Sequence, residues 1–249
     1  MLIALLIAAL FLLPRAVFAG LVALLIVAAG LEWARLCRLQ ASRAWFYAVA
    51  VAAVFCLAVF FPRSDKPIFI LAAAFWLAAV PAWLWRGLRE RDARALAAAG
   101  FAVLVPAGLA MVSLRPLEVL LVLVLVWIAD SAAYFVGRKW GRRKLAPAVS
   151  PGKTWEGAAG GVAGALGYAI ICGFFLDGIH WVPYLAAAAG LAVISIAGDL
   201  FESAAKRQAS VKDSGTLLPG HGGILDRIDS ATAVLPLAAL ISPLIKGPL

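Results

Sequence analysis

The chain has 249 residues, of which 65% are hydrophobic, and its mean hydropathy is +0.99. An ordinary soluble domain is less apolar, so the composition predicts a polytopic membrane protein. The formal net charge is +9, but the basic residues are divided among short segments between apolar runs, which argues against a nucleic-acid-binding domain and predicts no nucleic-acid partner.

Apolar runs make up most of the chain from its start. Residues 1–13 lack the basic start and the small-residue cleavage site of a signal peptide, and Pro14 separates them from a second run over 16–30. Further runs cover about 44–61, 68–85, 95–112, 117–137, 157–176, 183–201 and 228–245. Most approach the roughly 20 residues needed to cross a bilayer. The fold prediction is an all-α, polytopic helical bundle in the membrane with about nine transmembrane segments, and whether 1–30 forms one or two of them is left open.

Residues 1–112 are predicted to form an N-terminal transmembrane scaffold. Their apolar runs contain almost no ionisable residue, and four tryptophans near the run ends are typical of an interfacial aromatic belt: Trp33, Trp45, Trp83 and Trp85. The chain's three cysteines are widely separated and indicate neither a disulfide framework nor a metal site.

Basic residues are distributed unequally between the two sides of the predicted bundle. If segments 33–43, 86–94, 138–154 and 202–227 share one side, that side holds 17 Lys and Arg and the other side holds 5. The more basic segments of a membrane protein face the cytoplasm, so this side is predicted to be cytoplasmic.

The run over 117–137 contains a carboxylate at membrane depth, Asp130. Tyr134 follows one turn later on the same helix face. A carboxylate at the bilayer centre costs about 2.5–3.5 kcal/mol, so it usually marks a functional site. The alternative is a shallow Asp130 that pairs with Arg138 or Lys139.

The next segment contains the element Ser150-Pro-Gly-Lys153-Thr-Trp-Glu156-Gly. Its first five residues predict a tight turn with exposed N–H groups and a cation, which together can bind phosphate oxygens. The basic run 142–144 is interpreted instead as a signal for membrane orientation. The glycines at 157, 160, 161 and 164 predict a close crossing with another helix, the one that carries Asp130 or Asp199.

Residues 198–230 gather ionisable residues and glycines in a chain that is otherwise apolar. Helical spacing places Asp199, Glu202, Ser203 and Lys206 on one face of a helix that ends in this region, and Asp226 and Asp229 on one face of the next helix. Carboxylate oxygens hold Mg²⁺, and Lys and Arg hold phosphate oxygens. The pattern therefore suggests phosphoryl or nucleotidyl transfer.

Two regions of the chain resemble the phosphatidate cytidylyltransferases, also called CDP-diacylglycerol synthases. In the second region the similar positions are Ser203, Lys206-Arg207, Lys212-Asp213, Pro219, His221-Gly222-Gly223, Asp226-Arg227 and Asp229. In the first they are Asp130-Ser131-x-x-Tyr134-x-x-Gly137 and Ser150-Pro151-x-Lys153-Thr154-x-Glu156-Gly157. A match at about a dozen fixed positions is far more specific than a lone glycine motif.

The resemblance implies an enzyme of phospholipid biosynthesis, a nucleotidyltransferase that converts CTP and phosphatidate into CDP-diacylglycerol and pyrophosphate. It implies that residues 113–249 form the catalytic region, with Mg²⁺ bound by Asp199 and Asp226 and with K⁺ as a candidate second ion. The catalytic residues would be Asp199, Asp226, Lys206, Arg207, Lys212 and Arg227. The substrate-binding residues would be Asp130, Tyr134, Ser150, Lys153, Glu156, Ser203, Asp213, His221 and Asp229.

The implied location is the cell (inner) membrane, with the active site facing the cytoplasm, membrane lipids around the protein and a homodimer as the candidate assembly. Two alternatives remain open. One is a CTP-dependent enzyme that acts on a polyprenol or an archaeal ether lipid, and the other is a membrane transporter of an anionic solute, which would also carry ionisable residues within its helices.

Overall fold

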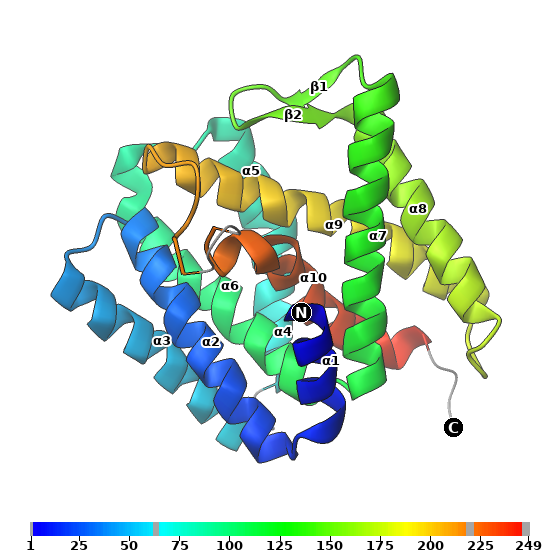
Figure 1. Ribbon diagram of the computed structural model, residues 1–249, viewed down its shortest axis with the longest axis horizontal. Coiled ribbons are helices and arrows are strands. Elements are labelled where there is room, and N and C mark those ends of the chain that lie inside the picture. The colour runs from blue at the N-terminus through cyan, green and yellow to red at the C-terminus, as the bar shows by residue number, and fades with distance from the viewer. Residues whose placement is uncertain (1, 62–64, 218–221, 246–249) are drawn as a thin grey trace.

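The computed structural model describes residues 2–61, 65–217 and 222–245, and they form a bundle of helices (Figure 1). The helices in chain order are α1 (Leu2–Leu12), α2 (Arg15–Leu36), α3 (Ala41–Phe60), α4 (Asp65–Ala74), α5 (Val80–Arg86), α6 (Ala93–Ser113), α7 (Pro116–Trp140), α8 (Trp155–Gly173), α9 (Trp181–Gln208) and α10 (Leu225–Ile245). A π-helical turn, Phe75–Ala79, joins α4 to α5 without a break, and a short 3-10 helix, Glu90–Asp92, precedes α6. The predicted all-α bundle is confirmed.

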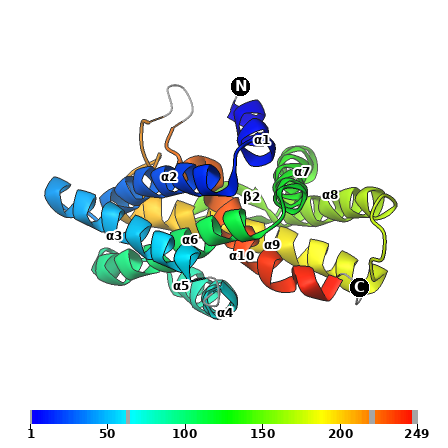
Figure 2. The ribbon, with the colours of Figure 1, turned by 90° about the horizontal axis from the view of Figure 1, so that it is seen from below.

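Seven helical stretches in the described residues are long and apolar enough to cross a membrane: Arg15–Leu36, Ala41–Phe60, Asp65–Arg86, Glu90–Ser113, Pro116–Trp140, Trp181–Gln208 and Leu225–Leu244. The other two predicted segments are also helical, as α1 with 11 residues and α8 with 19. Residues 1–30 contain two helices, because Pro14 cannot continue the first helix and disfavours helical geometry in the residue before it. In Figure 2, α1 and α4 lie on opposite sides of the bundle.

Three local boundaries differ from the predicted ones. Helix α9 continues to Gln208, beyond the apolar run over 183–201, and α10 begins at Leu225, before the run over 228–245. The predicted turn at Ser150 is a strand, β2 (Ser150–Thr154), paired antiparallel with β1 (Lys144–Ala146). The turn lies between the two strands, so a small hairpin projects from one end of the helical bundle (Figure 1).

The α8 glycines lie against α7, the helix that carries Asp130. A side chain at Gly161 would meet Ala129 O at 2.9 Å, and one at Gly160 would meet Val136 at 2.5 Å. Removing side chains from one helix face allows two backbones to approach closely. The predicted close crossing is therefore confirmed, and α7 is the partner helix.

Segments from four parts of the chain are joined at the end of the bundle that carries the hairpin. Arg38, after α2, contacts Glu90 at 2.7 Å and donates to Gln208 O at 2.9 Å. Gln208 Nε2 in turn donates to Leu36 O at 2.6 Å. Arg207 Nε donates to Val149 O of the hairpin at 3.3 Å. The four basic segments expected on one side therefore share one end of the molecule.

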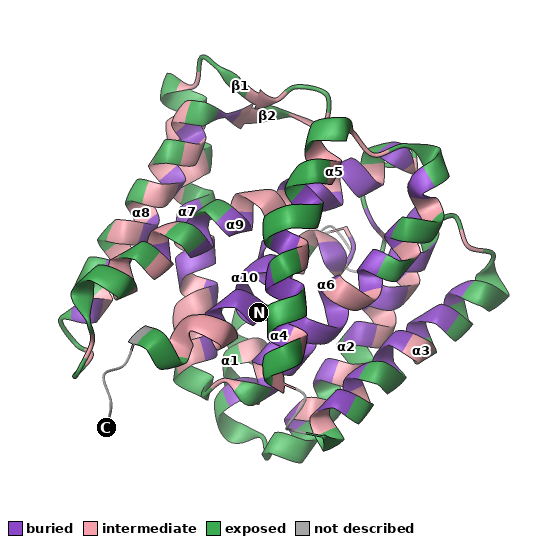
Figure 3. Ribbon diagram, turned by 180° about the vertical axis from the view of Figure 1, so that it is seen from behind, coloured by how far each residue is buried: buried purple, intermediate pink, exposed green. Residues whose placement is uncertain are grey.

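An aromatic cluster lies in the core beneath this end. Trp33 is 1% exposed, and its Nε1 donates to Leu96 O at 2.8 Å, so its assignment to an interfacial belt was wrong. Trp83 stacks on Phe201 with ring centroids 5.7 Å apart. Trp45 and Trp85 are exposed, as a belt requires. Figure 3 shows the contrast between the buried interior and the exposed outer faces of helices such as α3 and α8.

Candidate active site

Lys206 connects two acidic side chains where α9 lies against α10. Its Nζ is 2.6 Å from Asp226 Oδ1 and 3.1 Å from Glu202 Oε1. Glu202 is only 3% exposed. Burying an ion pair costs solvation energy, and further hydrogen bonds to its atoms help to offset that cost. Asp226 has such bonds, which come from the segment before α10.

Asp226 accepts several hydrogen bonds in the first turn of α10. Its Oδ2 accepts from the backbone N–H groups of Ser214, at 3.0 Å, and Gly223, at 2.8 Å, and lies 3.0 Å from Ser214 Oγ. Gly222 has a φ of 81°, in the left-handed region that glycine adopts without strain. The backbone thus folds around the Asp226 carboxylate.

A second ion pair links the hairpin to α9. Lys153 Nζ, from β2, lies 2.7 Å from Asp199 Oδ2, and Ser203 Oγ donates to Asp199 Oδ1 at 3.1 Å. Thr154 ends β2 and caps α8, because its Oγ1 accepts from the backbone N–H of Gly157 at 3.1 Å. This cap fixes the direction of the chain directly after Lys153.

Two further carboxylates lie within electrostatic range of this ion pair. Asp130 of α7 and Asp229 of α10 both interact with Asp199 and Lys153. The alternative partners considered for Asp130 have other contacts: Arg138 donates to Tyr134 Oη at 3.2 Å, and Lys139 lies 4.7 Å from the centroid of the Trp140 ring. Asp130 therefore belongs to an acidic cluster with Asp199 and Asp229.

Each of the two predicted metal ligands, Asp199 and Asp226, contacts the positive charge of a lysine. A lysine ammonium group lies at 2.7 Å from an oxygen of Asp199 and at 2.6 Å from an oxygen of Asp226. Among the described residues, no group of three or more His, Cys, Asp or Glu side chains is arranged so that it could hold a metal ion by itself. Mg²⁺ is usually held by one or two carboxylates together with water and substrate phosphates. The assignment of Mg²⁺ to Asp199 and Asp226 stays a prediction, and in this structure each of the two carboxylates is paired with a lysine.

Several predicted site residues lie at the edge of this acidic cluster or outside it. Tyr134 is 59% exposed, and Ser150 is half-buried in β2. Arg207 donates to the carbonyls of Val149 and Val211, at 3.3 and 3.4 Å. Lys212 and Asp213 are exposed in the segment after α9. His221 and Pro219 lie outside the described residues.

The contacts of Glu156 lie within the hairpin segment. Its carboxylate accepts from the backbone N–H groups of Arg142 and Arg143, at 3.0 and 3.2 Å, and from Arg143 Nε at 3.1 Å. Hydrogen bonds from its own backbone N–H and from that of Arg142 lower the pKa of the Glu156 carboxyl to about 2. Glu156 thus holds the base of the hairpin, and in this way it supports the segment that carries Lys153.

Two acidic residues with contacts in the site were not among the predicted site residues. Glu202 shares the helix face of Asp199 and Lys206, so its spacing was a usable signal. Glu32, at the end of α2, is completely buried and accepts hydrogen bonds from the segment before α10. The sequence gives no local signal for Glu32, because its partners lie more than 180 residues further along the chain.

A mainly apolar cavity of about 180 Å³ reaches the acidic cluster from inside the bundle. Its polar lining includes Asp130, Arg227 and Asp229. The remaining wall comes from α1, α2, α6, α7 and α10 and is mostly aliphatic, with Leu25 and Val126 among its residues. A cavity of this kind suits a molecule that joins an anionic or polar group to an alkyl chain.

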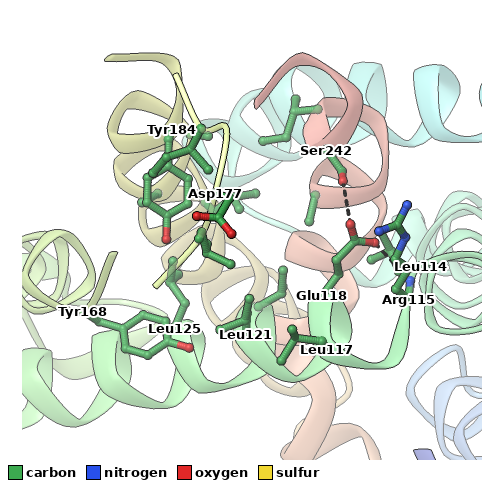
Figure 4. Close-up of a pocket in the computed structure, with 18 residues that line it drawn as sticks. Leu114, Arg115, Leu117, Glu118, Leu121, Leu125, Tyr168, Asp177, Tyr184 and Ser242 are labelled. Atoms are coloured by element: carbon green, nitrogen blue, oxygen red, sulfur yellow. Dashed lines mark hydrogen bonds between the residues drawn. The ribbon is translucent and has the colours of Figure 1, made fainter. Parts of the chain in front are cut away.

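Another cavity, of about 200 Å³, lies between α7, α8, α9 and α10 near their opposite ends (Figure 4). In this view Glu118 accepts from Ser242 Oγ at 3.4 Å, while Tyr168, Tyr184 and Asp177 line the other side. None of the predicted site residues lines it. The two cavities are therefore distinct features of the molecule.

The fold and the site together define a class of protein: a polytopic helical membrane protein whose lysines contact carboxylates on several helices at one end of the bundle. Comparison with known proteins narrows the class. The model of the cytidylyltransferase family matches residues 1–244, nearly the whole chain. The chain belongs to the cytidylyltransferase family and is a nucleotidyltransferase.

Individual relatives agree with this assignment. A phosphatidate cytidylyltransferase of Pseudomonas aeruginosa is 38% identical over 247 residues, covering 93% of this chain and 89% of the relative. Shorter matches reach higher identity. The enzyme of the same name from Haemophilus influenzae is 51% identical over 122 residues, 47% of this chain and 42% of the relative. The one from Bacillus subtilis is 53% identical over 116 residues, 45% of this chain and 42% of the relative.

Proposed function

We propose that this protein is a phosphatidate cytidylyltransferase, which makes CDP-diacylglycerol and pyrophosphate from CTP and phosphatidate in phospholipid biosynthesis. Relatives that carry this name support the proposal, in particular the one similar over most of both chains. The structural observation that carries it is the mainly apolar cavity whose lining includes Asp130, Arg227 and Asp229. Such a cavity allows an acyl chain to remain in an apolar environment while its phosphate lies beside the ionisable residues.

In the proposed reaction an oxygen of the phosphatidate phosphate attacks the α-phosphorus of CTP, and the bond to the pyrophosphate oxygen breaks. Both substrates are strongly anionic, so the site must offset their repulsion and stabilise the leaving group. Lys153 and Lys206 would bind phosphate oxygens, helped by Arg227 on the lipid side and by Arg207 and Lys212 at the rim. An ionised lipid phosphate is already a nucleophile, so no general base is required.

Mg²⁺ is proposed as the cofactor, held by Asp199 and Asp226, with K⁺ as a candidate second ion. When bound, Mg²⁺ would offset negative charge on the CTP phosphates and on the leaving pyrophosphate. Asp130 and Asp229 would add negative charge around Asp199. Support comes from the donor chemistry and from the lysine ammonium groups that contact both proposed ligands.

The protein is a multi-pass integral membrane protein, and its bacterial relatives point to the inner membrane. We propose that the end with the hairpin faces the cytoplasm, where CTP is available. The support is the excess of Lys and Arg in the four segments at that end. Homodimerisation stays a prediction, which mass measurement of the protein in lipid nanodiscs would test.

The experiment that tests the proposed function is pyrophosphate release by the purified protein in detergent micelles. Release is expected to require CTP, Mg²⁺ and phosphatidate together, and to stop when EDTA is added. Asp199→Asn and Asp226→Asn are each expected to lower the rate by about 100-fold or more, the size of loss seen when one group that stabilises transition-state charge is removed.

The matched control is Asp177→Asn, at the opposite end of the bundle, which should keep the parental rate. Absence of pyrophosphate release from folded protein under all these conditions would contradict the proposal and favour a transporter, to be tested by flux into sealed vesicles. Release with a polyprenol or ether-lipid phosphate but not with phosphatidate would assign a different lipid substrate. Full activity in both Asn variants would overturn the metal assignment alone.

A further inference from the structure

Glu32 is a buried carboxylate near the end of α2, far in sequence from the predicted site. It is 0% exposed and lies among apolar helices. Its Oε1 accepts from the backbone N–H of Ile224 at 3.0 Å, and its Oε2 accepts from the backbone N–H of Leu225 at 2.9 Å. These N–H groups are at the start of α10, where no carbonyl of the same helix is available to them. Glu32 therefore caps α10 from another helix.

Ser214 connects Glu32 to the proposed catalytic carboxylate. Its Oγ lies 3.0 Å from Glu32 Oε2 and 3.0 Å from Asp226 Oδ2, so the hydroxyl can donate to either oxygen. Its backbone N–H donates to the same oxygen of Asp226 at 3.0 Å. Asp226 in turn contacts Lys206 at 2.6 Å. The contacts form a continuous chain from α2 to α9.

Two glycines leave space for the Glu32 carboxylate. A Cβ at Gly215 would meet Glu32 Oε1 as its nearest atom, closer than real Cβ contacts allow. A Cβ at Gly223 would meet Ser214 Oγ and Glu32 Oε2. The backbone at Gly215 and the backbone at Gly223 therefore both lie directly against the Glu32 carboxylate. The space beside these two glycines therefore fits a side chain of the size of Glu32.

We propose that Glu32 is a positioning residue: it anchors Ser214 and the start of α10 at Ile224 and Leu225, and thereby fixes Asp226 against Lys206. The role in catalysis rests on the proposed function, whereas the anchoring does not. A helix cap that served stability alone would leave the kinetics of the folded enzyme unchanged. A positioning residue changes them, because the segment it holds ends at a residue of the site.

The test uses Glu32→Gln, which keeps the size of the side chain, and Glu90→Gln as the matched control, since Glu90 lies at the same end of the molecule and its side chain is 70% exposed. Full-length proteins in lipid nanodiscs are compared by hydrogen–deuterium exchange. In Glu32→Gln the amides of 214–217 and 222–226 are expected to exchange at least about tenfold faster, since the neutral amide is a weaker hydrogen-bond acceptor and places an NH₂ group near backbone donors. Glu90→Gln should exchange like the parent there.

The kinetic arm measures pyrophosphate release at saturating CTP and phosphatidate, together with the Mg²⁺ concentration that gives half-maximal rate. We expect Glu32→Gln to lose roughly 10–100-fold in kcat or in apparent Mg²⁺ affinity, the range found for groups that orient ligating residues. Unchanged exchange in 214–217 and 222–226, or changed exchange with parental kcat and Mg²⁺ dependence, would overturn the positioning role. If the parent protein shows no cytidylyl transfer, the proposed function fails, and exchange alone then decides whether Glu32 anchors the segment.

A second variant keeps the test decisive if Glu32→Gln does not fold. Gly215→Ala keeps the negative charge of Glu32, but the added methyl group would collide with the carboxylate and displace it. This variant is expected to produce the same faster exchange. Gly190→Ala in α9 is its control, because a Cβ there has nothing within 4 Å. Parental exchange in a folded Gly215→Ala protein would also count against the proposal.

Discussion

Lys153 and Lys206 each contact carboxylates that other elements supply. Lys153 reaches from β2 to Asp199 of α9, and Lys206 reaches from α9 to Asp226 of α10. Their side chains are 23% and 14% exposed, so water screens their charges only in part. Cations held in this way are already oriented before a phosphate arrives, which lowers the reorganisation needed during the reaction.

Replacing Lys153 tests the importance of this orientation. Lys153→Met is expected to lower kcat/KM for CTP by about 100-fold, because it removes a cation from a cluster of three carboxylates and leaves their repulsion uncompensated. The measurement is pyrophosphate release at several CTP concentrations.

Lys139→Met is the matched control for Lys153→Met. Lys139 is exposed at the same end of the molecule and lies over the Trp140 ring, outside the site. It should keep the parental kcat/KM. Equal losses in the two variants would show that the effect comes from total positive charge and not from the contact with Asp199.

At the scale of elements, the close crossing of α7 and α8 sets the position of Asp130 relative to the hairpin. Gly157 and Gly161 face two carbonyl groups of α7. A Cβ at Gly157 would lie 2.8 Å from the carbonyl oxygen of Ala133, and a Cβ at Gly161 would lie 2.9 Å from that of Ala129. The strand that carries Lys153 leads directly into α8. A change in the spacing between these helices therefore moves Asp130 with respect to Lys153.

Gly161→Leu tests this coupling between packing and the site. Overpacking a tight contact costs about 1–3 kcal/mol of stability, so we expect a lower melting temperature and reduced activity. Both are measured on the purified protein, by thermal unfolding in detergent and by pyrophosphate release.

Gly167→Leu on the same helix is the control, since a Cβ there has nothing within 4 Å. It should change neither quantity by much. A Gly161→Leu protein with parental melting temperature and activity would show that the crossing tolerates expansion.

At the scale of the whole molecule, four basic segments meet at one end although they are far apart in the sequence. The contacts of Arg38, Arg207 and Gln208 join the segments after α2, after α5, after α9 and within the hairpin. The acidic cluster lies directly beneath this end. A soluble anionic substrate would therefore approach through a positive rim, which favours its capture.

The predicted orientation can be measured by cysteine labelling. In a variant without its native cysteines, Arg91→Cys and Asp177→Cys introduce thiols at exposed positions on opposite ends. An impermeant maleimide is expected to label Arg91→Cys in inside-out vesicles and Asp177→Cys in intact spheroplasts, since the basic end faces the cytoplasm. The reverse pattern would invert the topology and place the site on the outer side.

The sequence by itself determined the class of fold and the identity of most residues in the acidic cluster. Runs of apolar residues must be helical in a bilayer, because every backbone polar group there needs a partner within the same segment. Asp199, Ser203 and Lys206 could be grouped from helical spacing, and α9 does place them on one face, where Ser203 contacts Asp199. The dense motif of residues 198–230 pointed to the family that comparison then confirmed.

The tertiary structure decided which charges pair and which helices hold them. Asp130 belongs with Asp199 and Asp229, and Glu156 holds the hairpin, although sequence spacing does not distinguish these roles. Glu32 lay in a region interpreted as scaffold, yet it contacts Ser214, 182 residues further along the chain. Local periodicity reports which face of a helix a residue occupies. It carries no information on which distant segment packs against that face, because that depends on how all the helices fit together.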